Sequence, residues 1–368
     1  MIYLDEAATT PVRRDVLEAM WPYLTGSFGN PSSRHEVGEL ARRALEDARR
    51  DIASFLGARP GEITFTSGGT EADNAAVKGI ALASTRGRHV VVSAIEHPAV
   101  LESAAWLARQ GFEVTELGVD EHGRVSPDAL AAVLRDDTAL VSIQHASNEV
   151  GTVQDIAALA AVAAERGVPF HTDAVQSAGW LDLDVATLGV QALSLSGHKL
   201  GAPKGVGVLW VARRTSCEPL LHGGGQENDR RSGTENVASA VGLAAALRAP
   251  RPDTGGVTKL RDRFIEQVLS GARGARLTGD PVHRQPGNAS FVFPGRSGES
   301  ILLDLERHGV IVSSGSACHA GSDEPSHVLT AMGMDREVAQ TAVRFTFSSA
   351  VTEEQLDAAA EAVVAVVG

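Results

Sequence analysis

A lysine near the middle of the sequence is placed where an amine could do covalent chemistry. Lys199 ends the run Leu195-Ser196-Gly197-His198-Lys199, which follows a β-rich stretch and leads into several glycines. An amine held at the end of a buried strand could form a Schiff base with a carbonyl compound. Taken alone, the run is also compatible with a surface lysine on a glycine-rich loop. A reactive amine is therefore predicted only if other groups hold the carbonyl compound beside it.

A carboxylate is predicted at the end of another buried strand. Asp173 follows Phe170-His171-Thr172 and precedes Ala174-Val175-Gln176. An unpaired carboxylate is costly to remove from water, so Asp173 requires a cationic partner. A protonated pyridine nitrogen is such a partner, and its charge lets the ring accept electrons from a bound substrate. A structural salt bridge and a helix N-cap are the alternatives.

A third motif offers a place for an anion. Ser67-Gly68-Gly69-Thr70 lies between a predicted strand and a predicted helix. Free backbone N–H groups and the helix dipole at such a turn favour a phosphate, although an ordinary strand-to-helix turn is the alternative. The motif has neither the Walker spacing nor Gly-x-Gly-x-x-Gly, so ATP and NAD are poor candidates.

The two cysteines of the chain are too few for a disulfide framework. Cys217 and Cys318 also lack Cys-x-x-Cys spacing, and no metal site is predicted. Cys318 lies in a run of small residues, Ser313 to Ser322, a composition that suits a nucleophile that must move to meet an acceptor. A buried, inert cysteine is the alternative.

The groups named above must be positioned by the helices and strands of the fold, which alternating helical and β-rich patterns indicate. These patterns predict an α/β fold in which a mostly parallel seven-stranded sheet lies between helices. Apolar residues at helical spacing predict a helix from Val37 to Phe55, which Gly57 ends. The predicted strands are Ile63 to Thr66, His89 to Ile95, Phe112 to Leu117, Leu140 to Ile143, Pro169 to His171, Ala192 to Leu195 and Gly207 to Val211.

A stretch rich in proline and glycine, residues 248–256, predicts a domain boundary. We expect a large domain at residues 15–250, and a smaller α+β domain at residues 1–14 and 251–368 that carries the Cys318 loop. Its predicted features are strands at Ile2 to Leu4, Asn288 to Phe293 and Val343 to Phe347, and a helix opened by the capping box Thr352-Glu353-Glu354-Gln355. Thr10-Pro11 is predicted to begin the first helix, as N-cap and first helical residue.

Composition excludes several classes of function. Lys and Arg number 33 against 46 Asp and Glu, and the net charge of −13 opposes direct binding to nucleic acid. The longest apolar runs are far shorter than the roughly 20 residues that span a bilayer. The N-terminus lacks the pattern of a secretory signal, so a cytoplasmic protein without a membrane segment is expected.

Ten motifs taken together resemble those of the cysteine desulfurases, which belong to the class V aminotransferase family. That family has the fold-type I architecture of pyridoxal-phosphate (PLP) enzymes. The resemblance extends over nearly the whole chain. The motifs are Tyr3-Leu4-Asp5, Ala8-Thr9-Thr10, Phe28 to Ser33, Thr66 to Asn74, Glu96-His97, Asn148 to Gly151, Asp173 to Gln176, Ser196 to Lys199, His222 to Thr234 and Ser313 to Cys318.

The resemblance implies a role for each matching residue. Lys199 would link covalently to PLP, Asp173 would pair with its ring nitrogen, Gln176 would donate to its ring hydroxyl, and His97 would stack on the ring and assist catalysis. The phosphate would be held by Gly69, Thr70, Ser196, His198 and Thr234, with Thr234 coming from the second subunit of a homodimer. Asn148 would contact both cofactor and substrate. Asn30 and Arg344 would hold the substrate, although an ion pair across the small domain is the alternative for Arg344.

The implied activity is removal of sulfur from L-cysteine. Lys199 would act as the base at Cα. The Cys318 thiolate would then take the sulfur as a persulfide and leave alanine. The sulfur would pass to an acceptor protein for iron–sulfur cluster assembly, tRNA or DNA thiolation, or another thio-metabolite. Selenocysteine lyase and cysteine sulfinate desulfinase are alternatives within the fold, and a non-catalytic PLP-binding sulfur-trafficking scaffold is an alternative from another class.

Overall fold

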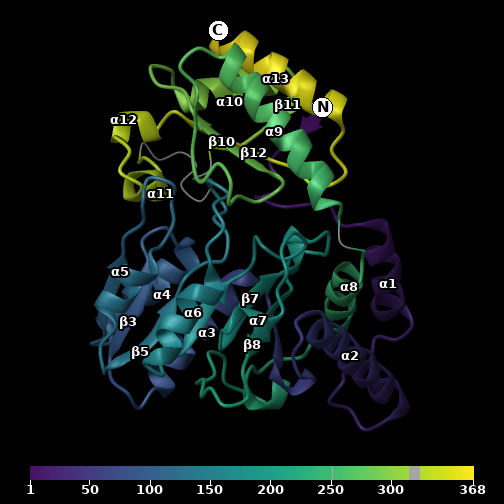
Figure 1. Ribbon diagram of the computed structural model, residues 1–368. Helices are drawn as coiled ribbons and strands as arrows, with labels where there is room; N and C mark the ends of the chain where they lie inside the picture. The colour runs from purple at the N-terminus through teal and green to yellow at the C-terminus, as the bar shows by residue number, and fades with distance from the viewer. Residues whose placement is uncertain (251, 315–323) are drawn as a thin grey trace.

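The computed structural model of the 368-residue chain describes residues 1–250, 252–314 and 324–368. Figure 1 shows a lower part built around a seven-stranded sheet and an upper part built around a three-stranded sheet. Both chain termini lie in the upper part. Cys318, the predicted sulfur acceptor, falls in residues 315–323 and therefore lies outside the described residues.

The large sheet has the strand order β2-β8-β7-β6-β5-β3-β4. Only β8 runs antiparallel to its neighbours, so β2 has the same direction as β7. The seven predicted strands are thus confirmed, with shifts of a few residues at their ends. Their bounds are β2 (Ile63–Thr66), β3 (His89–Ser93), β4 (Glu113–Leu117), β5 (Thr138–Ser142), β6 (Phe170–Asp173), β7 (Ala192–Ser196) and β8 (Gly207–Val211).

Helices surround this sheet and bury its apolar strands between them. Val90, Val91 and Val92 of β3 have no solvent exposure, as expected for a strand covered on both faces. The predicted helix over residues 37–55 is confirmed as α2. The helices of the lower part are α1 (Arg14–Thr25), α2 (Glu36–Phe55), η1 (Pro60–Glu62), α3 (Gly69–Ala83), α4 (Pro98–Arg109), α5 (Pro127–Val133), α6 (Ile156–Glu165), α7 (Val185–Leu188), η2 (Gly197–Lys199), η3 (Glu227–Asp229) and α8 (Val237–Leu247).

The upper part has its own apolar core, in which Phe264, Phe291 and Phe345 pack edge to face. Its C-terminal helix begins at the predicted capping box, where Thr352 caps the helix and Gln355 reaches back. The boundaries at residues 14/15 and 250/251 stay a prediction. The elements are β1 (Ile2–Tyr3), α9 (Thr254–Gly271), β9 (Arg276–Leu277), β10 (Asn288–Val292), α10 (Gly298–Arg307), β11 (Val310–Ile311), α11 (His327–Ala331), α12 (Arg336–Ala339), β12 (Ala342–Thr346) and α13 (Glu353–Val367).

The predicted start of the first helix at Thr10-Pro11 is wrong, because α1 begins at Arg14 with Arg13 as its N-cap. The Thr10 side chain makes tertiary contacts instead. Its hydroxyl donates to the carbonyl oxygen of His198 and accepts from the N–H of Gly201, both at 2.9 Å. These bonds fasten the N-terminal segment to the loop that carries Lys199.

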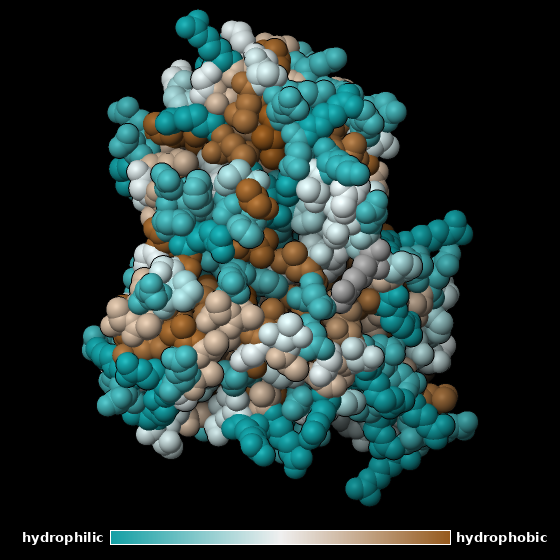
Figure 2. Space-filling view, in the orientation of Figure 1, coloured by the Kyte–Doolittle hydropathy of each residue, from teal (hydrophilic) through white to brown (hydrophobic). Residues whose placement is uncertain are grey.

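The surface in this orientation is mostly hydrophilic, with hydrophobic residues reaching it in scattered groups on both parts (Figure 2). Among the described residues, none of the helices has the length and apolar character needed to cross a bilayer.

Candidate active site

Among the described residues, the predicted reactive groups Lys199, Asp173 and His97 share one edge of the large sheet. The strands β2, β3, β6 and β7 run in the same direction, so the turns that follow them lie at the same side. Ligands of open α/β sheets bind outside this carboxyl edge. Side chains from the upper part also reach it. The structure therefore brings together, at one place, groups that are far apart in the sequence.

Lys199 ends the short helix η2 directly after β7. Its Nζ atom donates to the carbonyl oxygen of Ala8 at 2.8 Å and also to that of Ala7. The amine therefore points at the N-terminal segment that Thr10 fastens in place. A half-buried amine that is held by carbonyl oxygens is available to react with a carbonyl compound once those bonds are exchanged.

Asp173 is the last residue of β6 and is buried. One carboxylate oxygen accepts from the N–H of Val175 at 2.8 Å. Burial raises the pKa of Asp173, while the N–H of Val175 and the positive charge of Lys199 lower it. Within the described ranges, Asp173 takes part in no ion pair with an arginine, lysine or histidine. The carboxylate is thus placed to pair with a cation that the described chain does not supply.

His97 follows β3 and is the N-cap of α4, with its Nδ1 atom accepting from the N–H of Ala99 at 3.1 Å. Pro98 follows it as the first residue of the helix. Burial lowers the pKa of His97, and the charge of Lys199 lowers it further against the opposing effect of Asp173. The ring is therefore neutral near pH 7 and can act as an acceptor of protons or stack on a flat ligand.

The turn before α3 leaves room for an anion. The first intrahelical bond of α3 runs from the N–H of Ala72 to Gly68, and no side chain caps the helix. The start of the helix is pressed against the ends of β6 and β7: a Cβ atom on Gly69 would lie 2.7 Å from a Val175 methyl group and 3.3 Å from the Cβ of Ser196. Glycine at position 69 is therefore required for this close approach.

The other predicted phosphate ligands lie around the same turn. Ser196 is buried beside Gly69, and Thr70 is exposed at the start of α3. Nδ1 of His198 lies 3.1 Å from the Thr9 hydroxyl oxygen, and burial lowers the pKa of His198 to about 4, with a further contribution from Lys199. His198 is therefore neutral at pH 7. Thr234 is exposed, and it lines a cavity of the same chain together with Ser67.

Gln176, the predicted ligand of the PLP ring hydroxyl, and Arg344, the predicted substrate ligand, also lie at this edge of the large sheet. The Gln176 amide donates to the carbonyl oxygen of Ala7 at 3.0 Å, the same atom that Lys199 contacts. Buried Arg344 on β12 donates to the carbonyl oxygen of Asn148 and to the carboxylate of Asp5, each at 2.8 Å. The Asp5 contact is the ion pair named above as the alternative for Arg344. A substrate carboxylate would have to compete with Asp5 for this guanidinium.

Asn30 is not brought to Lys199 by any contact among the described residues. Its side chain accepts from the N–H of Ser32 at 2.9 Å, and it is exposed before α2. Its predicted substrate contact stays a prediction.

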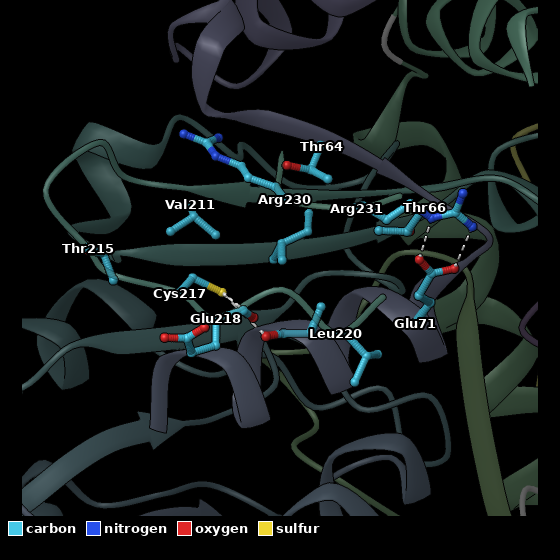
Figure 3. Close-up of a pocket in the computed structure, with 12 residues that line it drawn as sticks. Thr64, Thr66, Glu71, Val211, Thr215, Cys217, Glu218, Leu220, Arg230 and Arg231 are labelled. Carbon is cyan, nitrogen blue, oxygen red and sulfur yellow. Dashed lines mark hydrogen bonds and ion pairs between the residues drawn. The ribbon is translucent and has the colours of Figure 1, made fainter. Parts of the chain in front are cut away.

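Cys217 lies at a different place, in a cavity between α3, β8 and the segment that follows β8 (Figure 3). Its Sγ atom is 3.5 Å from the carbonyl oxygen of Ala75. Burial raises the pKa of Cys217 to about 11, so that it remains a thiol at neutral pH. These properties are the opposite of those of a reactive cysteine.

Sequence reasoning missed a buried polar cluster behind Asp173. His171 of β6 bonds to the hydroxyls of Ser142 at 2.8 Å and Ser194 at 2.9 Å, and lies 3.8 Å from Asp73 of α3. Burial raises the pKa of Asp73, and the charge of Asp173 adds to this effect. The signal was present in the sequence: a histidine inside a predicted buried strand needs hydrogen-bond partners from neighbouring elements.

Replacing His171 with asparagine is expected to reduce the pH dependence of stability. Burial lowers the pKa of His171 to about 3, whereas the ordinary value is 6.5. The unfolded chain therefore takes up a proton at this residue as the pH falls below that value, and the folded protein does not. This uptake destabilises the fold by about 1.4 kcal/mol between about pH 7.5 and about pH 5.5.

Urea unfolding at both pH values measures this effect. The variant should lose about 1.4 kcal/mol less than the wild type, because groups with raised pKa such as Asp73 act equally in both proteins. The exposed His308→Asn is the matched control and should behave like the wild type. Equal losses in His171→Asn and wild type would contradict a neutral, buried His171.

Comparison with known proteins agrees with this geometry. The chain matches the family described as aminotransferase class-V over residues 2–359. Cysteine desulfurase IscS from Dictyoglomus turgidum is 48% identical over 361 residues, which cover 97% of this chain and 92% of that protein. A solved NifS-like protein has a TM-score of 0.91 and 35% identity, with 99% of this chain and 98% of the other covered. SspA, solved in complex with cysteine, has a TM-score of 0.84 and 38% identity over 94% of this chain and 99% of its own.

The chain therefore belongs to the class V aminotransferase family, and its fold is the predicted fold-type I architecture. Within that family, it groups with the proteins named cysteine desulfurases.

Proposed function

We propose that this protein is a PLP-dependent cysteine desulfurase, a sulfurtransferase that converts L-cysteine into L-alanine and an enzyme-bound persulfide. One observation carries the proposal: the Lys199 amine, the Asp173 carboxylate and the uncapped start of α3 meet at one edge of the sheet. An amine, an anion that takes part in no ion pair within the described chain, and the free backbone N–H groups of an uncapped helix start match the aldehyde, ring nitrogen and phosphate of PLP.

The residues present fit this cofactor. Asp173 would hold the ring nitrogen protonated, and the neutral His97 ring would stack on the pyridine. Gln176 would exchange its bond to Ala7 for one to the ring hydroxyl. The phosphate would take the free N–H groups at Gly69 and the side chains of Thr70, Ser196 and His198, together with Thr234 from the partner in a homodimer. When bound, PLP supplies an electron sink for bonds at the substrate's Cα atom.

The chain's own residues then move protons and sulfur. Lys199 would take the proton from the substrate's Cα atom, with neutral His97 assisting. Arg344 and Asn148 would orient the substrate, with Arg344 transferring from Asp5 to the α-carboxylate. Asn30 would add a further contact to the substrate.

Sulfur transfer would form one bond and break one. The Cys318 thiolate attacks the substrate sulfur, so that an S–S bond forms and the Cβ–S bond breaks. The products are a persulfide on Cys318 and alanine, and no outside oxidant or reductant is needed. An acceptor protein would then remove the outer sulfur atom.

A comparison of three substrates tests this assignment. Purified protein loaded with PLP is expected to form alanine from L-cysteine and L-selenocysteine, but only the reaction with L-cysteine should require Cys318 as sulfur acceptor. L-cysteine sulfinate, whose sulfur is already oxidised, should yield alanine equally in the wild type and in Cys318→Ala. Alanine formation is measured by amino-acid analysis in wild type and Cys318→Ala. If L-cysteine yields no alanine while L-cysteine sulfinate does, the protein is a desulfinase instead.

A further inference from the structure

A left-handed turn lies in the segment of residues 221–234, which carries the predicted phosphate ligand Thr234. Glu227, Asn228 and Asp229 have φ angles of +50°, +55° and +64°. Residues with a side chain avoid this region because Cβ then approaches the following carbonyl oxygen. Three such residues in succession persist only where surrounding contacts hold them.

A buried ion pair between Arg49 and Glu227 stabilises this left-handed turn. The Glu227 side chain is 2% exposed and the Arg49 side chain 4%. The guanidinium of Arg49 binds both carboxylate oxygens, with Nη1 at 2.6 Å from Oε2 and Nη2 at 2.9 Å from Oε1. Such a two-pronged contact fixes direction as well as distance, because the guanidinium and the carboxylate must be coplanar.

The same pair is fastened to strand β2. The N–H of Phe65 donates to Glu227 at 2.9 Å, and Nη1 of Arg49 donates to the carbonyl oxygen of Ile63 at 2.9 Å. The guanidinium carbon also lies 5.0 Å from the centre of the Phe65 ring. The left-handed turn is therefore locked to the strand that ends one residue before Ser67.

A second ion pair joins the segment to the start of α3. Nε of Arg231 lies 2.9 Å from the Glu71 carboxylate, and the two side chains face each other in Figure 3. The other Glu71 oxygen accepts from the N–H of Ser67 at 2.8 Å. Thr234 and Ser67 line one cavity with Glu227. The two ends of the left-handed turn are thus tied to the two sides of the Ser67–Thr70 turn.

We propose that Arg49 and Glu227 are positioning residues for the phosphate site: their ion pair holds the left-handed turn, and with it the position of Thr234 and of Arg231 beside the start of α3. The inference rests on the proposed function, because the anion is taken to be the phosphate of PLP. It applies to whichever subunit's site Thr234 serves, since the pair fixes the whole segment.

Binding of PLP and of pyridoxal, which lacks the phosphate, separates this role from a general structural one. Both ligands are titrated into full-length protein freed of cofactor, with absorbance as the readout. Glu227→Gln is expected to weaken PLP binding by at least about tenfold and to change pyridoxal binding by less than about twofold, because Arg49 loses its anionic partner and the turn loosens. Glu218→Gln, at an exposed position shortly before the segment, is the matched control and should bind both ligands as the wild type does.

Second variants keep the test decisive if Glu227→Gln folds poorly. Arg49→Lys keeps the charge but loses the two-pronged geometry, and should lower PLP affinity relative to pyridoxal in the same way. Adding Asn228→Gly to Glu227→Gln should restore part of the lost PLP affinity, because glycine adopts positive φ without strain.

Two results would overturn the inference: an equal loss of affinity for PLP and pyridoxal, or no loss of PLP affinity in either the Glu227 or the Arg49 variant. A wild type that binds neither PLP nor pyridoxal would instead defeat the proposed cofactor.

Discussion

Replacing Lys199 with alanine is expected to abolish alanine formation from L-cysteine, lowering kcat by about 10⁴-fold or more. The residue has two roles in the proposed reaction, as the covalent link to PLP and as the base at the substrate's Cα atom. The structure places its amine next to the carbonyl oxygens of Ala7 and Ala8, beside the Asp173 carboxylate. The positive charge of Lys199 lowers the pKa of Asp173.

An absorbance spectrum accompanies the activity assay. The visible band that PLP shows when it is linked to the protein should be present in the wild type and absent from Lys199→Ala. Exposed Lys204, five residues further on, gives the matched control Lys204→Ala, which should keep both the band and the activity. Substantial turnover by Lys199→Ala would remove this lysine from the mechanism.

Replacing Cys318 with alanine is expected to abolish sulfur release from L-cysteine, by about 10³-fold or more, and to leave cofactor binding intact. The reason is chemical: without a thiol, nothing in the proposed site accepts the sulfur atom, whereas none of the groups that hold PLP is altered. The measurements are sulfide production in the presence of a thiol reductant and the visible absorbance band of the bound cofactor.

Cys217→Ala is the internal control for this prediction. The thiol of Cys217 is buried, its pKa is raised to about 11, and it lies in the cavity between α3 and β8. Its removal should leave sulfur release unchanged. Normal sulfur release by Cys318→Ala, or loss of sulfur release in Cys217→Ala, would show that Cys318 is not the sulfur acceptor.

The strands and the groups at their ends could be predicted because local sequence determines them. Uninterrupted apolar runs such as Val90 to Val92 indicate buried strands. Asp173 ends another buried strand, and Lys199 lies three residues after the end of a third. The α13 capping box is equally local. The start of α1 was predicted wrongly because Thr10 bonds to His198, a residue far away in the sequence.

Contacts between distant residues were beyond the reach of pattern reasoning. Arg49 and Glu227 are 178 positions apart, and no sequence motif predicts that they form an ion pair. The ion pair between Arg344 and Asp5 likewise forms only because β12 packs beside the N-terminal segment. Sequence spacing says which residue types are available, and the fold decides which of them meet.

A single turnover with L-cysteine tests directly whether Cys318 takes the sulfur of the substrate. Wild-type protein loaded with PLP is mixed with one equivalent of L-cysteine, its sulfur groups are trapped by alkylation, and peptides are mapped by mass spectrometry while alanine is quantified. We expect one persulfide on Cys318 for each alanine formed and none on Cys217. Alanine formed without a persulfide on Cys318 would contradict this expectation.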